Sequence, residues 1–357
     1  MSLVWCPARR PTGLGRTAPC SGSVRGISPL PRRARPVLGC VLLTAALLGC
    51  APPPAAPAVD TAAPVPAATG APEAAAAPAP APPVSAAAPA PADCTNGTAW
   101  SCDQQRRFAA ASAYVARSGG GHGYLSAVFT DRRTGLTWRV GPTRQPGWTA
   151  STIKLAIATD LVERGRAGAI TLTAADRHDL DAMLANSDEP ASNRLWAKYG
   201  DDAMLARFRE QFGMPGVRFV PGFSVRAYWG FVKCTSDDLA ALVRHILTVT
   251  DPADRRYLVA AMRAVAPNQR WGVWAAGAGN QPGNKDGWSF ESDSYGKHWV
   301  ADSVGFAGPG ERYVVAVMYQ VDPRGTLADG VHAVSDLVAL LFGQPVPAPV
   351  TVPAPDG

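Results

Sequence analysis

Hydrophobic residues recur with two different spacings between residues 100 and 345, and each spacing predicts one kind of element. An early stretch, 103–117, repeats apolar residues every three or four positions, as an amphipathic helix does. The residues on its apolar side are Phe108, Ala111 and Val115. The next apolar segments, 125–130 and 136–140, are short and contain β-branched and aromatic residues. We expect them to form two strands joined by a hairpin loop.

The middle of the chain has the spacing of helices. Five segments show it: 151–165, 173–186, 190–199, 201–212 and 236–248. Strand-like sequence returns after residue 270 and is followed by a last helix, and these elements are expected at 289–290, 299–306, 312–320 and 329–341. Strands at both ends of a helical middle predict an α/β (α+β) fold, in which an antiparallel sheet flanked by N- and C-terminal helices receives an inserted all-helical subdomain. A groove between sheet and insert is a natural place for a site.

The first 93 residues do not have the pattern of a folded domain. Residues 1–49 contain seven arginines and no acidic residue, and their apolar run, 37–48, is too short to span a bilayer. This arrangement is typical of an export signal. Its end, Leu47-Leu48-Gly49-Cys50, resembles the bacterial lipobox, in which the signal is cleaved before the cysteine and the cysteine is lipidated. We therefore expect a lipoprotein signal peptide over 1–49 and a lipid on Cys50, which would anchor the exported protein to the outer face of the cell membrane.

A tether separates this signal from the folded region. Alanine and proline make up 33 of the 43 residues from 51 to 93, and no aromatic residue is present there. Such a segment buries too little surface to fold, so we expect 50–93 to be disordered and extended. The folded domain is expected over 94–345, and a disordered tail over 346–357.

The formal net charge of +6 belongs to the signal rather than to the domain. From residue 94 onward the chain contains 27 basic and 25 acidic residues, without a basic tract that would suit nucleic acid. Three cysteines remain in this part, and outside the cytoplasm a disulfide is expected among them: Cys102 could pair with Cys94 or with Cys234. Neither these cysteines nor the five histidines have the spacing of metal ligands, so we expect no metal and no cofactor.

The candidate chemistry begins at Thr149-Ala-Ser-Thr-Ile-Lys154, where a predicted helix starts. Ser151 and Lys154 are three residues apart and so share one side of that helix. A serine hydroxyl is a poor nucleophile until a base removes its proton, and a lysine that its surroundings keep neutral can be that base. The chain has 29 arginines and only 5 lysines, and arginine cannot act as a base. Unpaired N–H groups at the helix start favour negative charge near Ser151.

Two further segments contain candidate site residues. Ser187-Asp188-Glu189 precedes Pro190, which suits the first turn of a helix, so these residues are expected in a loop that points into the groove. Lys285-Asp286-Gly287-Trp288 precedes strand-like sequence, which places Lys285 on or beside an edge strand. Taken separately, the first segment also fits a helix cap and the second an ordinary turn.

Together these segments resemble the penicillin-recognising serine enzymes, the superfamily of class A β-lactamases and penicillin-binding D,D-peptidases. That family carries Ser-x-x-Lys, then Ser-Asp-Asn or Ser-x-Asn, then Lys-Thr-Gly, and this chain has Ser151, Ser187 and Lys285 in the same order. The resemblance covers roughly 100–345 and is to the compact actinobacterial lipoprotein type. It implies the same sheet and helical insert that the apolar pattern predicts.

The resemblance implies a role for each of the four polar residues. Ser151 would be the acylated nucleophile and Lys154 its base. Ser187 would relay a proton to the nitrogen that leaves the substrate. Lys285 would supply positive charge beside Ser187 and the substrate carboxylate. No cofactor takes part in such a reaction.

The remaining motif residues would hold the substrate. Backbone N–H groups of Ser151 and Trp288 would form the oxyanion hole, with Gly287 allowing close approach. Glu189 and Asp286 would face the substrate where the family has Asn and Thr or Ser. Glu189 only accepts hydrogen bonds, and an ionised Asp286 is expected to repel the carboxylate of a β-lactam.

Two more departures bear on turnover. Only 36 residues separate Ser151 from Ser187, fewer than in class A β-lactamases. In addition, no residue matches the class A glutamate that activates the deacylating water. Glu210 is the nearest candidate, but Arg207-Phe-Arg-Glu210 has the pattern of a solvated helix face. We therefore expect slow deacylation.

Two functions of different classes fit these observations. The first is a serine hydrolase that forms an acyl-enzyme on Ser151 from a β-lactam or a D-Ala-D-Ala-like cell-wall peptide. The second, which Glu189 and Asp286 favour, is a catalytically inactive lipoprotein that binds a wall peptide or a protein partner in the groove. The aromatic pair Tyr228-Trp229 fits either the lining of the groove or the core. In both cases we expect a monomer that contacts the membrane only through its lipid anchor.

Overall fold

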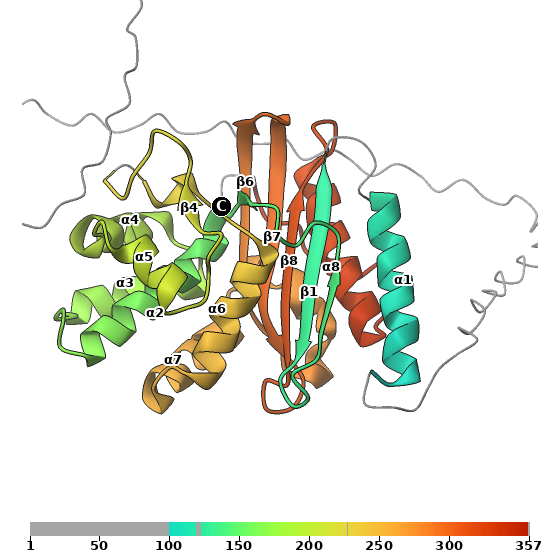
Figure 1. Ribbon diagram of the computed structural model, residues 1–357, viewed down its shortest axis with the longest axis horizontal. Helices are drawn as coiled ribbons and strands as arrows, with labels where there is room; N and C mark the ends of the chain where they lie inside the picture. The colour runs from blue at the N-terminus through green and yellow to red at the C-terminus, as the bar shows by residue number, and fades with distance from the viewer. Residues whose placement is uncertain (1–99, 119–122, 227, 356–357) are drawn as a thin grey trace, which may run out of the picture. The chain divides into compact units, whose positions relative to one another are not determined.

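The computed structural model describes residues 100–118, 123–226 and 228–355. The predicted signal peptide and tether, with the lipidation site Cys50, lie outside the described residues. Figure 1 shows the described part as a central sheet with helices on both of its faces. The sheet and one helical layer combine segments from both ends of the domain, whereas the other helical layer comes from the middle of the chain.

A five-stranded antiparallel sheet forms the centre of the fold, in the order β2-β1-β8-β7-β6. Its strands are β1 (Tyr124–Asp131), β2 (Thr137–Val140), β6 (Gly283–Asp293), β7 (Gly296–Ala307) and β8 (Tyr313–Gln320). Strands from the two ends of the domain meet where β1 pairs with β8, from Tyr124 opposite Gln320 to Asp131 opposite Tyr313. The prediction of one antiparallel sheet made of distant segments is therefore confirmed, and β6 lies at its edge.

Two helices cover one face of the sheet (Figure 1): α1 (Cys102–Ser118) and α8 (Leu327–Phe342). The apolar side predicted for the first helix is the side that is buried, with Phe108, Ala111 and Val115 turned inward. Phe108 and Phe342 both pack against Phe129 of β1, with ring centres 5.6 and 5.5 Å from it. The two terminal helices and the sheet thus share one apolar core.

The helical subdomain covers the other face. Its helices are α2 (Ile153–Arg166), α3 (Ala174–Ala185), α4 (Glu189–Tyr199), α5 (Met204–Glu210), α6 (Ser236–Thr248) and α7 (Pro252–Arg263). Every residue of α2 from Ile153 to Val162 is buried, which is typical of a helix enclosed by others. The inserted helical subdomain of the prediction is confirmed, although it also contains the short strands β4 (Arg218–Phe219) and β5 (Val232–Cys234). Its central helix is the one that begins beside Ser151.

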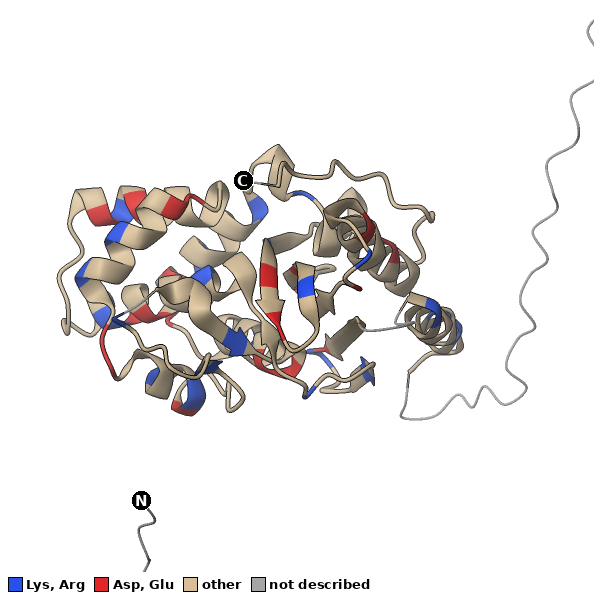
Figure 2. Ribbon diagram, turned by 90° about the horizontal axis from the view of Figure 1, so that it is seen from above, with Lys and Arg blue, Asp and Glu red and all other residues tan. Residues whose placement is uncertain are grey.

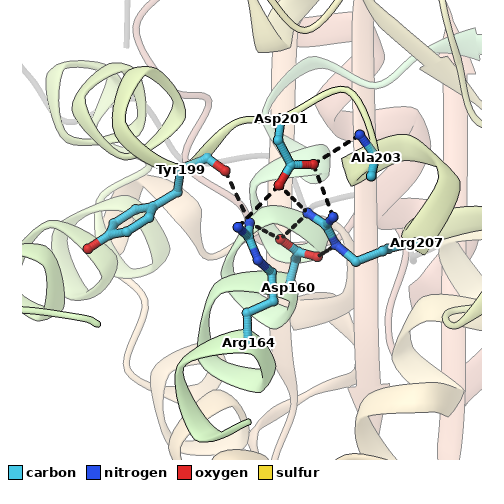
Figure 3. Close-up of polar contacts among 6 residues, drawn as sticks. All are labelled: Asp160, Arg164, Tyr199, Asp201, Ala203 and Arg207. Atoms are coloured by element: carbon cyan, nitrogen blue, oxygen red, sulfur yellow. Dashed lines mark hydrogen bonds and ion pairs between the residues drawn. The ribbon is translucent and has the colours of Figure 1, made fainter. Parts of the chain in front are cut away.

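A network of ion pairs joins α2 to α5, as Figure 3 shows. Asp160 of α2 is 1% exposed and accepts hydrogen bonds from Arg164, at 3.1 Å, and from Arg207 of α5. Both arginines also reach Asp201, which is 38% exposed. The expectation that Arg207 lies on a solvated helix face is wrong, because a buried carboxylate needs charged partners and Arg207 is one of them. Glu210, at the end of α5, is exposed.

Some elements are missing from the sequence-based prediction. Helix α7 starts at Pro252 after its N-cap residue Asp251 and buries Leu258, Val259 and Met262, so the sequence does contain its amphipathic signal. A second sheet contains three strands of two or three residues, which are too short to show a period: β3 (Gly147–Trp148), β5 (Val232–Cys234) and β4 (Arg218–Phe219). Strand β6 begins at Gly283, well before the expected 289, and therefore includes Lys285.

The cysteine predictions are partly resolved. Cys102 is disulfide-bonded, whereas Cys234 is a free thiol in the core. The pairing of Cys102 with Cys234 is therefore wrong. Cys94 lies outside the described residues, so its pairing with Cys102 stays a prediction.

The C-terminal segment differs from the expected disordered tail. Residues 346–355 lie along the domain. Ala348 N donates to Asp336 Oδ1 of α8 at 2.7 Å, and Val350 and Val352 pack against the core beneath α8. Alternating prolines remove backbone donors that solvent would otherwise have to satisfy, so this segment can pack without forming a helix or strand. Composition alone does not reveal such contacts.

Two substitutions in the ion-pair network test whether the burial of Asp160 determines how much the network stabilises the fold. Asp160→Ala leaves two poorly exposed guanidinium groups without their buried partner, so we expect the free energy of unfolding to fall by about 3–5 kcal/mol. The control Asp201→Ala removes the more exposed partner of the same arginines, and we expect it to cost about 1 kcal/mol or less. Urea denaturation followed by tryptophan fluorescence measures both changes. Equal losses would contradict the idea that burial of Asp160 sets the strength of the network.

Candidate active site

Ser151 lies in a short 3₁₀ turn, Ala150–Thr152, directly before α2. Ala150 bends the chain there with a φ of 42°, a left-handed value that is uncommon for a residue with a Cβ. The Thr152 hydroxyl fastens the turn by donating to Thr149 O at 2.6 Å. Ser151 is 9% exposed and lines a pocket of about 650 Å³. The candidate nucleophile thus stands at the start of a buried helix and at an open pocket.

The pocket lies where the helical subdomain meets the edge strand β6. Its walls come from the loop before α4, from β6 and from the C-terminal segment: Ser151, Asn186, Ser187, Asp188, Glu189, Pro190, Trp288, Ser289, Phe290 and Pro355. Lys154 and Lys285 lie behind this lining and reach Ser187 from two sides. The groove between sheet and insert therefore contains residues of all three motifs.

Lys154 is fully buried and points at the loop before α4. Its Nζ donates to Ser187 O at 2.6 Å and to Ser187 Oγ at 3.2 Å, and it lies 4.5 Å from the ring centre of Trp229. Burial lowers the pKa of Lys154 to about 8, although the negative charges of Glu189 and Asp188 oppose this effect. A substantial fraction of this amine is therefore neutral near pH 8, which is the state that a base needs.

Ser187 lies in the turn between α3 and α4 with a φ of 58°, a conformation that costs about 1–3 kcal/mol for a residue other than glycine. The next residue holds the turn in place, because Asp188 caps α4 by accepting from Ala191 N at 2.6 Å. This turn directs Ser187 Oγ at both amines, 3.2 Å from Lys154 Nζ and 3.0 Å from Lys285 Nζ. The strained conformation therefore places the Ser187 hydroxyl between the two lysine amines.

Lys285 reaches the cluster from the sheet. It is 1% exposed, and besides Ser187 its Nζ donates to the carbonyl oxygen of Asp286 at 2.8 Å. Burial, together with the neighbouring charge of Lys154, lowers the pKa of Lys285 well below its usual value. Two buried amines that share one hydroxyl repel each other when both are charged, so the cluster favours a state with one neutral lysine.

Asp286 does not reach the pocket, and its assignment to substrate binding is corrected. Successive residues of a strand point to opposite faces, so Asp286 lies on the other side of β6 from Lys285. It is 0% exposed, and its Oδ1 accepts from Ser303 Oγ of β7 at 2.6 Å. Burial raises the pKa of Asp286 to about 8. Because the carboxyl points away from the pocket, the expected repulsion of a substrate carboxylate has no basis in this position.

Gly287 lets β6 approach the turn that carries the nucleophile. A Cβ at this position would lie 2.7 Å from the backbone nitrogens of Ser151 and Thr152, too close for packed atoms. The backbone of Ser151 therefore lies directly against the strand that continues to Trp288. An oxyanion hole made of the Ser151 and Trp288 N–H groups needs this close approach.

Glu189 lies at the rim of the pocket, at the first position of α4, and is exposed. Its charge acts on Lys154, and it contributes, after burial, to raising the pKa of Tyr228 to about 12. Glu189 thus gives the rim a negative charge where the family has a neutral asparagine. Trp229, the neighbour of Tyr228, is buried and donates from Nε1 to Asn193 Oδ1 at 2.8 Å.

Several residues of the site are not predicted from the motifs. Gln269 Oε1 lies 3.5 Å from Lys285 Nζ, and Phe290 and Pro355 line the pocket. Phe290 could have been found, because it alternates with Trp288 along the same strand and is 55% exposed. Gln269 and Pro355 have no local signal, since they reach the site only through the fold.

Other kinds of site find no support in the part of the chain that the structure describes. Within it, no three or more His, Cys, Asp and Glu side chains are grouped to hold a metal ion. None of its helices has the length and apolar character needed to cross a bilayer. Figure 2 shows acidic and basic residues interspersed along the ribbon.

Known proteins resemble this chain at two levels. No protein-family model matches it. In sequence, it is 29% identical over 205 residues to "Putative lipoprotein LppW" of Mycobacterium tuberculosis H37Rv and to the protein of that name from Mycobacterium bovis. The match covers 54% of this chain and 62% of each relative.

Solved β-lactamases are similar in structure. A β-lactamase of Burkholderia vietnamiensis superposes with a TM-score of 0.54 and 20% identity, over 66% of this chain and 95% of that one. One from Xanthomonas campestris pv. campestris gives 0.54 and 20%, over 68% and 98%. A variant of the class A β-lactamase of the last common ancestor of Gram-negative bacteria gives 0.52 and 20%, over 67% and 97%. The chain therefore has the class A β-lactamase fold that its three motifs predict.

Proposed function

We propose that the pocket is the active site of a serine hydrolase that forms an acyl-enzyme on Ser151, with a β-lactam or a D-Ala-D-Ala-like cell-wall peptide as acyl donor. One observation carries the proposal: Ser187 Oγ lies 3.2 Å from Lys154 Nζ and 3.0 Å from Lys285 Nζ, at the pocket that Ser151 lines. Burying two amines destabilises the fold unless hydrogen-bond partners offset the loss of hydration. Such costly groups are common at functional sites. The fold shared with β-lactamases supports the same chemistry.

Acylation would use the residues as follows. Neutral Lys154 takes the proton of Ser151 Oγ as this oxygen attacks the carbonyl carbon of the donor. The N–H groups of Ser151 and Trp288 hold the resulting oxyanion. When the carbon–nitrogen bond breaks, Ser187 gives its proton to the leaving nitrogen and regains one from the Lys154 ammonium. Lys285 would hold the Ser187 hydroxyl in position through its 3.0 Å hydrogen bond during the transfer.

Deacylation would be slow. Hydrolysis of the ester requires a base that activates water, and the sequence has no match to the class A glutamate. Among the described residues that line the pocket, the carboxylates belong to Asp188, which is engaged as the cap of α4, and Glu189, which is exposed at the rim. We therefore expect an acyl-enzyme that persists long enough to be detected.

A catalytically inactive binding protein is the second candidate. It is favoured by the C-terminal segment, because Pro355 lines the pocket and Ala354 O accepts a hydrogen bond from Trp288 Nε1 at 3.0 Å. The C-terminal segment thus already contributes one residue to the pocket wall and one acceptor to Trp288. Glu189, in place of the family's asparagine, favours the same candidate. Such a protein would bind a wall peptide or a protein partner without cleaving it.

We also propose that the protein is exported and anchored to the outer face of the cell membrane through a lipid on Cys50, with the domain as a monomer. The lipobox-like end of the leader supports this proposal. The name of the mycobacterial relative, which designates a lipoprotein, supports it as well.

A covalent adduct separates the two candidates. On incubation with a fluorescent penicillin, and separately with a neutral acyl donor, we expect intact-mass measurement to show one added acyl group that is lost in Ser151→Ala. Ser289→Ala is the control, because Ser289 lines the same pocket without a role in the proposal. If neither reagent forms an adduct with the unmodified protein, the binding protein is the correct candidate.

The pH dependence tests the base. The neutral form of Lys154 predominates above its pKa of about 8, so the acylation rate should rise with pH and level off above that value. Lys154→Arg, which keeps the charge but cannot lose it, should lower the rate by about 10²–10⁴-fold. The control Lys233→Arg changes a lysine that pairs with Asp293, and it should leave the rate nearly unchanged. A pH-independent rate would exclude Lys154 as the base.

Gly287→Ala tests the contact between β6 and the nucleophile turn. The added methyl group forces the strand away from Ser151, so we expect a loss of about 1–3 kcal/mol in unfolding free energy and an acylation rate about 10²-fold lower. Gly279→Ala is the matched control, because a Cβ there meets no atom within 4 Å. Thermal denaturation and the rate of adduct formation measure both effects. Full activity in Gly287→Ala would contradict the close approach.

A further inference from the structure

The C-terminal segment 344–355, here called the strap, runs from the end of α8 to the pocket. Helix α8 ends at Gly343, which has a φ of 66° and turns the chain back along the domain. Ala348 is 3% exposed, and its N–H donates to Asp336 Oδ1 at 2.7 Å. Val350 and Val352 of the strap then pack against the core that α8 shares with the sheet, and the strap reaches β6, where Trp288 Nε1 donates to Ala354 O at 3.0 Å. It is therefore fixed at two points.

The strap is stiff between these points. Five of its residues are prolines: Pro345, Pro347, Pro349, Pro353 and Pro355. Proline restricts φ in the unbound chain as well, so little conformational freedom is lost when the segment lies down on the domain. A short contact at its end can then hold the last residues in place.

We propose that the strap is a built-in competitor of the substrate, with Ala354 bound to Trp288 and Pro355 forming part of the pocket wall, so that its end restricts which molecules reach Ser151. The two fixed points differ in strength. Ala348 and Pro353 are buried, whereas Ala354 is exposed and is held by one hydrogen bond to a half-buried indole. The end of the strap can therefore detach while the rest stays bound.

The effect depends on the size of the incoming molecule. A tethered segment acts at an effective concentration in the millimolar range, so even a weak contact competes with a dissolved ligand. A molecule that extends along β6 past Trp288 must displace Ala354 and Pro355, whereas a small one can pass beside them. The identification of the excluded molecules as large acyl donors rests on the proposed function. The position of Pro355 in the pocket wall does not depend on that function.

The test measures access without requiring catalysis. In the full chain carrying Ser151→Cys, the thiol at position 151 is alkylated by a small reagent, iodoacetamide, and by a large one, iodoacetamidofluorescein, and peptide mass spectrometry follows each rate. The same rates are measured in a chain that ends after Pro353, which keeps the buried residues Ala348 and Pro353. We expect truncation to raise the rate of the large reagent by about tenfold or more and that of the small one by less than about threefold.

Two further measurements complete the experiment. A synthetic peptide of residues 350–357, added to the truncated chain, should slow the large reagent again. Trp288→Phe removes the donor to Ala354 and should raise the rate of the large reagent as the truncation does. Trp138 stacks on Phe108 away from the pocket, so the control Trp138→Phe should leave that rate unchanged. Equal rates of the large reagent in the full and truncated chains would overturn the proposal. Because alkylation of a cysteine needs no acyl transfer, this result is independent of whether Ser151 is ever acylated.

Discussion

The pocket depends on the sharing of one serine hydroxyl by two buried lysine amines. An isolated ammonium inside a protein is strongly unfavourable, and two of them a few ångströms apart also repel each other. The structure offsets this with acceptors, since Lys154 Nζ reaches Ser187 O and Lys285 Nζ reaches Asp286 O. The part of the burial cost that these acceptors do not offset lowers the pKa values of both amines. The same burial that makes the cluster costly makes one lysine available as a base.

Three parts of the fold must keep their relative positions for this cluster to exist. Lys154 comes from α2, Ser187 from the turn before α4, and Lys285 from the edge strand β6. Helix α2 is held by its buried surroundings and by the ion pairs of Asp160, and β6 is held against the nucleophile turn because Gly287 has no side chain. Stability and placement of the reacting groups are therefore set by the same contacts.

The sequence predicts the elements and the motifs better than it predicts side-chain directions. The helices, the sheet of distant strands and the class A β-lactamase fold follow from periodicity and from three ordered motifs. The direction of Asp286 does not follow from them, because the motif suggests a residue that faces substrate, whereas the pleat of β6 turns it toward Ser303. Arg207 is misjudged for a similar reason: its partner Asp160 is 47 residues away in the sequence. The path of the C-terminal segment depends on tertiary contacts, which its composition does not predict.

The placement of Asp286 changes the balance between the two candidate functions. In the sequence, two acidic residues, Glu189 and Asp286, favour an inactive protein because both would oppose the binding of an anionic substrate. Asp286 is buried and faces Ser303, so only Glu189 remains as such an obstacle. Glu189 is exposed at the rim, where salt screens a charge over about 8 Å at physiological ionic strength. The features that oppose the proposed catalysis therefore lie at the entrance of the pocket, as the strap does, whereas the four residues proposed to react line the pocket or lie buried behind its lining. An entrance of this kind would select among substrates rather than abolish the reaction.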